Sequence, residues 1–81
     1  MTDPDQDTMA TLWGEVLGCP PPGPDEDFFD LGGQSIIAAR LVRAVQHVFG
    51  VRVPLHVVFD HPTVPAFTEF VLARRGSERT V

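Results

Sequence analysis

The chain has 81 residues, a formal net charge of −5 and 43% hydrophobic residues, which indicates a single small domain over 1–81 with one compact core. Residues 1–30 hold eight acids and no base, and all six basic residues are arginines from Arg40 onward, so no nucleic-acid partner is expected. The single Cys19 cannot form an internal disulfide, and the sequence offers no metal site. No apolar run is long enough to span a membrane. A cytoplasmic protein is therefore expected.

The first patterned segment runs from Asp5 to Leu17 and predicts a helix. Acidic residues gather at its beginning, where the helix dipole favours negative charge. Gly18 is expected to end this helix, and Trp13 is expected to lie in the core. The apolar residues recur at helical spacing and form one stripe: Met9, Leu12, Trp13, Val16 and Leu17.

A long loop is predicted over about 18–34. Prolines crowd the run from Pro20 to Pro24, which cannot be helical and indicates a stiff connector. A loop of this length is usually either functional or disordered. Three apolar residues inside it, Phe28, Phe29 and Leu31, are expected to pin it to the helices and so favour an ordered loop.

The second helix is predicted over 36–49, followed by a stop at Gly50. One broad face is apolar and is expected to face the core: Ile37, Ala38, Leu41, Val42, Val45, Val48 and Phe49. The opposite face is polar and is expected to face solvent: Arg40, Arg43, Gln46 and His47. Ile36 is an exception, because it projects onto this polar face.

A short extended connector, Val51 to Pro54, is expected after the second helix. Leu55 to Asp60 can then form a helix of one or two turns, which Pro62 ends.

The last helix is expected to begin after Thr63 as its N-cap, with Pro65 in the first turn. Gly76 is expected to end it, leaving a frayed tail at 77–81. The predicted fold class is therefore all-α, a small four-helix bundle with three longer helices and one short helix.

Ser35 follows a glycine pair and directly precedes the second helix, a position where a serine is most often only an N-cap. Three features favour a functional role. Gly32 and Gly33 give an open backbone that another molecule can approach closely. Ile36 leaves an apolar side chain in solvent beside the hydroxyl. The beginning of a helix also favours an anionic group such as a phosphodiester.

Catalysis by Ser35 itself is disfavoured. A nucleophilic serine needs a base within reach, and neither a suitably placed histidine nor a G-x-S-x-G turn accompanies it. No catalytic residue is therefore expected.

The run from Phe28 to Ile37, FFDLGGQSII, resembles the modification site of peptidyl carrier proteins, the thiolation domains of nonribosomal peptide synthetases. The resemblance extends through the helix around Trp13, the VRVPL connector and the FDHPTV segment before the last helix. It implies a fold of the acyl-carrier-protein type. Gln34 departs from the family, which usually has His or Asp there, and Ile36 stands where Leu is commoner.

The resemblance implies that Ser35 carries a covalent 4′-phosphopantetheine arm derived from coenzyme A, within a flanking motif of Gly32, Gly33 and Gln34. A phosphopantetheinyl transferase would attach the arm, and an adenylation enzyme would load an amino or aryl acid on it as a thioester. Downstream condensation or tailoring enzymes would then act on the tethered acyl group, whose effective concentration the tether raises. The protein would be a non-catalytic carrier in natural-product, for example antibiotic, biosynthesis.

A free-standing carrier is expected, because the chain begins with Met1. It is also expected to be a monomer. The candidates for partner binding are Ile36, Arg40, Arg43, Phe29 and Leu31. For Phe29 and Leu31 a role as core anchors is favoured, and a merely solvated face accounts equally well for Arg40 and Arg43.

Other functions remain open at this stage. The chain could be an acyl carrier of polyketide or fatty-acid synthesis, although the Gly-Gly pair before Gln34 favours a peptidyl carrier. It could be a helical protein-interaction module in which Ser35 only caps a helix. A helix-turn-helix DNA-binding protein is opposed by the acidic charge.

Overall fold

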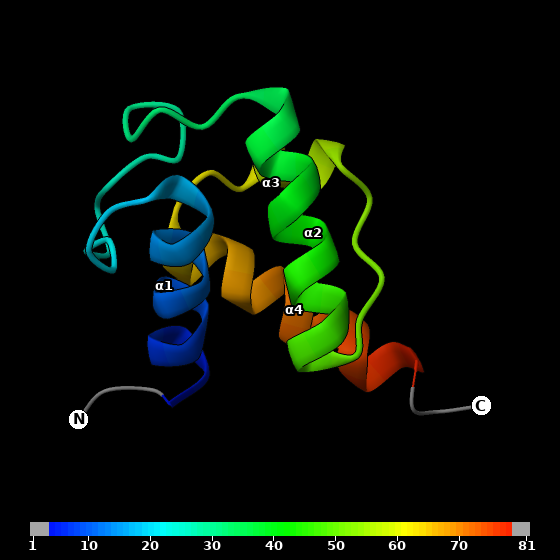
Figure 1. The fold of residues 1–81 in the computed structure, drawn as a ribbon. Coiled ribbons are helices and arrows are strands. Elements are labelled where there is room, and N and C mark those ends of the chain that lie inside the picture. Colours follow the sequence, from blue (N-terminus) through cyan, green and yellow to red (C-terminus); the bar gives the residue numbers. More distant parts are fainter. Residues whose placement is uncertain (1–3, 79–81) are drawn as a thin grey trace.

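The computed structural model describes residues 4–78. These residues form four helices and no strand: α1 (Pro4–Leu17), α2 (Ser35–Phe49), α3 (His56–Asp60) and α4 (Val64–Glu78). Figure 1 shows the loop 18–34 passing from the end of α1 to the beginning of α2. The predicted all-α bundle with three longer helices and one short helix is confirmed.

The core is built around Trp13 of α1, which is fully buried. α1 packs against both α2 and α4. The Trp13 ring meets Phe28 of the loop edge-on, with 5.1 Å between ring centroids, and Phe67 of α4 at 5.8 Å. Edge-to-face aromatic pairs of this kind add about 0.5–1.5 kcal/mol each beyond their buried area. One side chain therefore joins α1, the loop and α4.

α2 presents its apolar face to this core as the periodicity predicts. Ala38, Leu41, Val45 and Phe49 are buried, whereas the four residues predicted on the polar face are exposed. The prediction is wrong for Val48, whose side chain is 52% exposed. Val48 lies about 60° around the helix from Val45, at the edge of the stripe, and in the last turn no other element covers it.

The connector after α2 begins at Gly50, whose φ of 70° turns the chain out of the helix. Val51 and Val53 of the connector are buried, while Arg52 and Pro54 are exposed. This alternation is expected of an extended segment with one face on the core.

α3 begins at His56, one residue later than predicted, and buries Val57 and Val58. Thr63 caps α4 as predicted, because its Oγ1 accepts a hydrogen bond from the Ala66 N–H at 3.4 Å.

The predicted stop at Gly76 is wrong, since α4 continues through it to Glu78. A glycine inside a helix costs only about 0.5–1 kcal/mol relative to alanine, which a helix with a buried face tolerates. Of the predicted tail 77–81, the first two residues are thus helical, and 79–81 lie outside the described residues.

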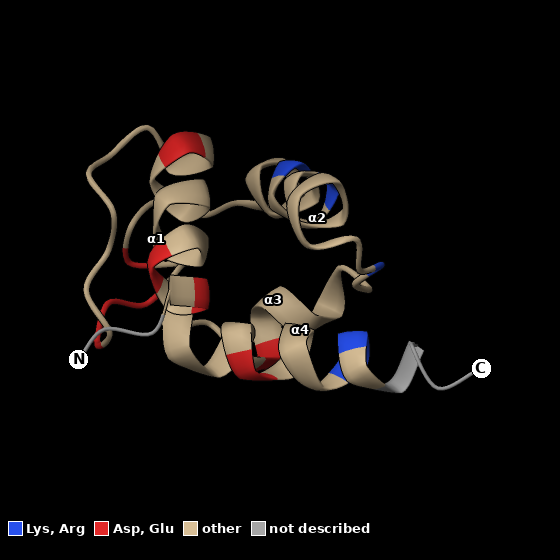
Figure 2. Cartoon of the chain, turned by 90° about the horizontal axis from the view of Figure 1, so that it is seen from below, with Lys and Arg blue, Asp and Glu red and all other residues tan. Residues whose placement is uncertain are grey.

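Charge is divided between two sides of the fold. Acidic residues lie on α1, on the loop, at the end of α3 and on the first part of α4, whereas arginines lie on α2, on the connector and toward the end of α4 (Figure 2). None of the helices within residues 4–78 combines the length and apolar character needed to cross a bilayer.

Candidate functional site

The loop residues before Ser35 fold into a compact turn held by their own backbone. The Leu31 N–H donates to the Asp27 carbonyl at 3.1 Å, and the Gly33 N–H donates to the Phe28 carbonyl at 2.9 Å. The Asp27 side chain accepts a further bond from the Phe29 N–H at 2.8 Å. Such local bonds replace the regular structure that the loop lacks, so the segment leading to Ser35 is ordered.

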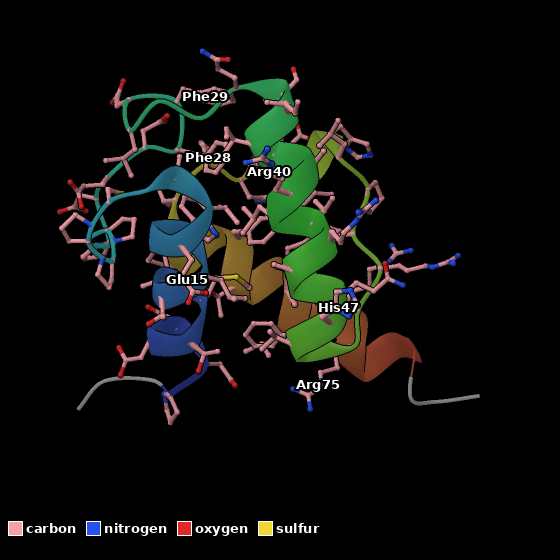
Figure 3. All side chains as sticks on the ribbon, in the orientation of Figure 1. Glu15, Phe28, Phe29, Arg40, His47 and Arg75 are labelled. Atoms are coloured by element: carbon pink, nitrogen blue, oxygen red, sulfur yellow. The ribbon has the colours of Figure 1, made fainter. Side chains whose placement is uncertain are left out.

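Phe28 anchors this turn to the rest of the fold. Its side chain is fully buried, and its N–H donates to the Pro62 carbonyl between α3 and α4 at 2.7 Å. The expectation that Phe29 is also a core anchor is wrong, because its side chain is 41% exposed. Phe29 instead stacks on Phe59 of α3, with 5.1 Å between ring centroids. Figure 3 shows Phe28 turned toward the interior and Phe29 above it in the loop.

The two glycines before the serine serve different purposes. Gly33 is buried, and a Cβ added to it would overlap the Phe28 ring, so its missing side chain makes room for Phe28. The expectation of an open backbone is therefore wrong for Gly33. Gly32 is exposed, has a φ of 93°, and has no atom within 4 Å of the position that a Cβ would take. Only Gly32 offers open backbone near the serine.

Ser35 is the first residue of α2, and its side chain is exposed. Gln34 occupies the N-cap position without a capping side-chain bond, so the interpretation of Ser35 as an N-cap is wrong. Within residues 4–78, no side chain or backbone group hydrogen-bonds to the Ser35 hydroxyl. The hydroxyl is therefore free to react with a group brought by another molecule.

The beginning of α2 also offers unpaired donors. The first bond of this helix runs from the Ala38 N–H to the Gln34 carbonyl at 2.8 Å, which leaves the N–H groups of Ser35, Ile36 and Ile37 without acceptors among the described residues. No acidic residue lies in this turn. Free N–H groups at the positive end of a helix suit the oxygens of a phosphodiester, so these residues fit a phosphate-linked group on Ser35.

The surface around Ser35 is apolar. Ile36, next in sequence, is 65% exposed, as the helical wheel predicts, and the Phe29–Phe59 pair is partly exposed. The sequence reasoning missed Leu55 and Phe59, which are 40% and 37% exposed. The sequence did contain a signal for these exposed residues. The short segment that forms α3 has more apolar residues than one buried helix face can hold. Leu31 is half-buried.

The two arginines proposed for partner contact lie farther along α2 and are both exposed. Arg40 projects from the second turn (Figure 3), and Arg43 lines a groove beside the connector. The structure thus separates Ile36 and Phe29, near Ser35, from Arg43, which is about 12 Å farther along the helix axis.

Comparison with known proteins gives a consistent result. Residues 7–71 match the family described as phosphopantetheine attachment site. The chain is 38% identical over 78 residues to phosphinothricin tripeptide synthetase PhsC of Streptomyces viridochromogenes, covering 96% of this chain and 7% of that protein. It is 46% identical over 77 residues to CymA of Salinispora arenicola, a probable non-canonical nonribosomal peptide synthetase, covering 95% of this chain and 1% of that protein. The chain therefore spans a small part of the relatives it matches.

A solved structure shares the fold as well. It contains a peptidyl carrier protein in complex with the phosphopantetheine transferase Sfp and coenzyme A. The likeness has a TM-score of 0.85 at 31% identity and covers 91% of this chain and 96% of that chain.

Proposed function

Because the chain belongs to the phosphopantetheine attachment-site family, as a carrier domain of the nonribosomal peptide synthetase type, we propose that Ser35 is its attachment residue. The observation that carries this assignment is the exposed Ser35 hydroxyl, which has no hydrogen-bond partner among the described residues. The group attached in this family is 4′-phosphopantetheine from coenzyme A, and it supplies a thiol that can hold an acyl group as a thioester.

The chain's own part in this chemistry is to present the hydroxyl and to receive the phosphate. The free N–H groups at the beginning of α2 favour the negative charge that arrives with the phosphodiester. The turn anchored by Phe28 holds Ser35 in one place relative to α1 and α3. Holding the serine in place lowers the entropy cost when a transferase binds.

We propose that the chain is not itself an enzyme. Among the described residues, a catalytic base oriented by a carboxylate is most nearly matched by His56 and Asp60 of α3, with 3.2 Å between Nδ1 and Oδ2. Both side chains are largely exposed, and neither hydrogen-bonds to Ser35. A base for deprotonating Ser35 would come from the transferase, so the carrier needs none.

The partners that we propose are a phosphopantetheinyl transferase, an adenylation enzyme, and downstream condensation or tailoring enzymes. They would dock on the apolar surface around Ser35, where Ile36 and the stacked Phe29 and Phe59 rings lie exposed. Apolar side chains left in solvent beside a reactive group are typical of contact sites. Leu31 and Arg40 would lie at the border of this surface.

Intact-protein mass spectrometry tests the proposal. The unmodified protein is incubated with coenzyme A, Mg²⁺ and a broad-specificity phosphopantetheinyl transferase, alongside Ser35→Ala and, as a matched control, Ser77→Ala. We expect one phosphopantetheine to be added to the wild type and to Ser77→Ala, and none to Ser35→Ala. A folded wild type that gains nothing would refute the carrier assignment, and a gain in Ser35→Ala would show that another residue is modified.

A further inference from the structure

The three longer helices of the fold begin in different ways. α1 has acidic residues in its first turn, Asp5 and Asp7, where the helix dipole favours negative charge. α4 has a side-chain cap, because Thr63 Oγ1 accepts a hydrogen bond from the Ala66 N–H. Among residues 4–78, α2 has neither feature, since its first turn holds no acid and no side chain bonds at its N-cap position. The beginning of α2 is therefore left uncapped by the described chain.

The residue at the N-cap position of α2 explains why the cap is missing. Gln34 has an extended backbone, with φ of −106° and ψ of 172°, but its side chain makes no capping bond. The side chains that commonly cap helices are the shorter Ser, Thr, Asp and Asn. The Gln34 side chain is exposed and forms no hydrogen bond with the described residues. Gln34 thus leaves the N–H groups of Ile36 and Ile37 free, and it places no negative charge beside them.

The uncapped position lies next to the residue proposed to carry a phosphate. We propose that Gln34 leaves the beginning of α2 uncapped so that the free N–H groups of this turn bind the phosphodiester on Ser35. Modification then stabilises the first turn of the helix. This inference rests on the proposed function, and it does not depend on the helix end alone, because the family to which the chain belongs carries phosphopantetheine covalently.

The energetics favour a phosphate over a neutral cap at this place. Hydrogen bonds from N–H groups to an anionic oxygen are roughly twice as strong as those between neutral groups. A phosphate on a serine at the beginning of a helix forms roughly one to three such bonds. A carboxylate at position 34 would compete for the same N–H groups and would repel the phosphate. The neutral, non-capping Gln34 avoids both effects.

The same turn carries part of the surface proposed for partner binding. Ile36 belongs to the first turn of α2, and its side chain is 65% exposed. Binding of the phosphate by this turn would restrict the backbone that holds Ile36. The transferase, which binds the unmodified carrier, would therefore meet Ile36 on a looser turn than the enzymes that bind the modified carrier. Gln34 would in this way let the modification be sensed at the docking surface.

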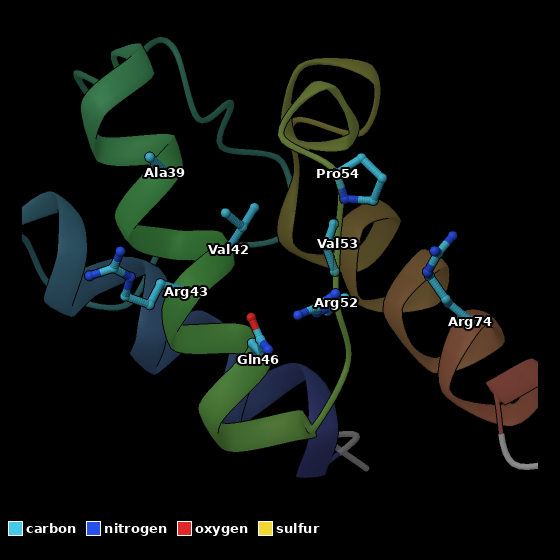
Figure 4. Close-up of a pocket in the computed structure, with 8 residues that line it drawn as sticks. All are labelled: Ala39, Val42, Arg43, Gln46, Arg52, Val53, Pro54 and Arg74. Carbon is cyan, nitrogen blue, oxygen red and sulfur yellow. The ribbon is translucent and has the colours of Figure 1, made fainter.

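The test measures how much modification stabilises the protein when position 34 is changed. Gln34→Ser adds a neutral cap, and Gln34→Glu adds a negative charge with little change in size. Gln46→Glu is the matched control, because Gln46 is exposed near the other end of α2, about 16 Å from Ser35 along the helix axis (Figure 4). Each protein is prepared unmodified and fully modified, using coenzyme A, Mg²⁺ and a broad-specificity transferase. Mass spectrometry with peptide mapping checks that the group is on Ser35.

Thermal unfolding and amide hydrogen exchange followed by NMR give the two readouts. We expect modification of the wild type to raise the Tm by about 4–8 °C at low salt and to slow exchange of the Ile36 and Ile37 N–H groups by about fivefold. The rise in Tm should fall as salt increases. It should persist in Gln46→Glu. It should drop to less than half in Gln34→Ser, where the serine already accepts one of these N–H groups, and in Gln34→Glu, where the carboxylate repels the phosphate.

The outcomes separate this inference from the proposed function. A folded wild type that gains no group on Ser35 would refute the proposed function and this inference with it. With complete modification, an equal rise in Tm in all four proteins would show that the arm stabilises the fold by contacts elsewhere. Unchanged exchange of Ile36 and Ile37 in the modified wild type would show that their N–H groups do not bind the phosphate, whether or not the Gln34 variants are fully modified. Either of these two results would overturn this inference and leave the carrier function intact.

Discussion

The ring of Phe28 fills the space that a side chain on Gly33 would need, because a Cβ at Gly33 would overlap Phe28 Cδ2 and lie 2.6 Å from the Phe28 carbonyl oxygen. Gly33→Ala should therefore force the turn before Ser35 to open. We expect a loss of about 1–3 kcal/mol in the free energy of unfolding. Urea unfolding followed by the fluorescence of the single Trp13 measures it, and an unchanged midpoint would show that the turn adapts freely.

Gly76→Ala should instead stabilise the fold. Gly76 lies inside α4, is exposed, and has open space where a Cβ would be. Alanine removes the entropy cost of glycine in a helix, so the free energy of unfolding should rise by about 0.5–1 kcal/mol. The same urea titration measures this change. A Gly76→Ala variant that is less stable than the wild type would mean that the helix does not continue through this position in solution.

Ser35→Ala should leave the fold intact although it abolishes loading. The Ser35 hydroxyl makes no hydrogen bond among the described residues, so its removal should change the free energy of unfolding by less than about 0.5 kcal/mol. Thr63→Ala is the matched comparison, because Thr63 does cap its helix and its loss should cost about 1 kcal/mol. Equal losses in the two variants would mean that Ser35 also acts as a cap.

The neighbouring Phe28 and Phe29 should respond very differently to truncation. Phe28→Ala empties a fully buried site and should cost about 3–5 kcal/mol, with Phe28→Leu as a milder variant if the first does not fold. Phe29→Ala removes a partly exposed ring stacked on Phe59 and should cost less than about 1.5 kcal/mol. Thermal unfolding followed by circular dichroism measures the two losses of stability. A larger loss in Phe29→Ala than in Phe28→Ala would contradict the anchoring role of Phe28.

Ile36→Ser should slow the transferase without affecting stability, since the side chain is 65% exposed beside Ser35. Loss of one apolar contact at the centre of an interface should lower kcat/KM by about tenfold. Val48→Ser is the control, because Val48 is 52% exposed on the same helix but about 20 Å from Ser35. If both variants slow the transferase equally, Ile36 is not a specific contact.

The periodicity of the sequence predicted the helices well, but a glycine alone did not predict where a helix ends. Gly50 and Gly76 both follow an apolar stripe, yet only Gly50 stops its helix. After Gly50 the chain must leave the helix so that Val51 and Val53 can reach the core. After Gly76, no described residue has to leave the helix to reach the core, and the helix continues to Glu78.

The proposed site could be placed at Ser35 from the sequence because the FFDLGGQS motif is local. Its surroundings depend on contacts between distant segments. The tight fit of Phe28 against Gly33, the stack of Phe29 on Phe59, and the groove that Arg43, Arg52 and Arg74 line all require the folded arrangement. A helical wheel shows the face on which Ile36 lies, but it does not show which residues of other segments lie near that face. A free-standing chain and a cytoplasmic location stay predictions.

The bond from the Phe28 N–H to the Pro62 carbonyl and the stack of Phe29 on Phe59 tie the loop to α3 and its following turn at two adjacent points. Loop and short helix should therefore fluctuate together as one unit. If an enzyme docks on α3 as proposed, this coupling would let it influence how Ser35 is presented without touching the loop itself.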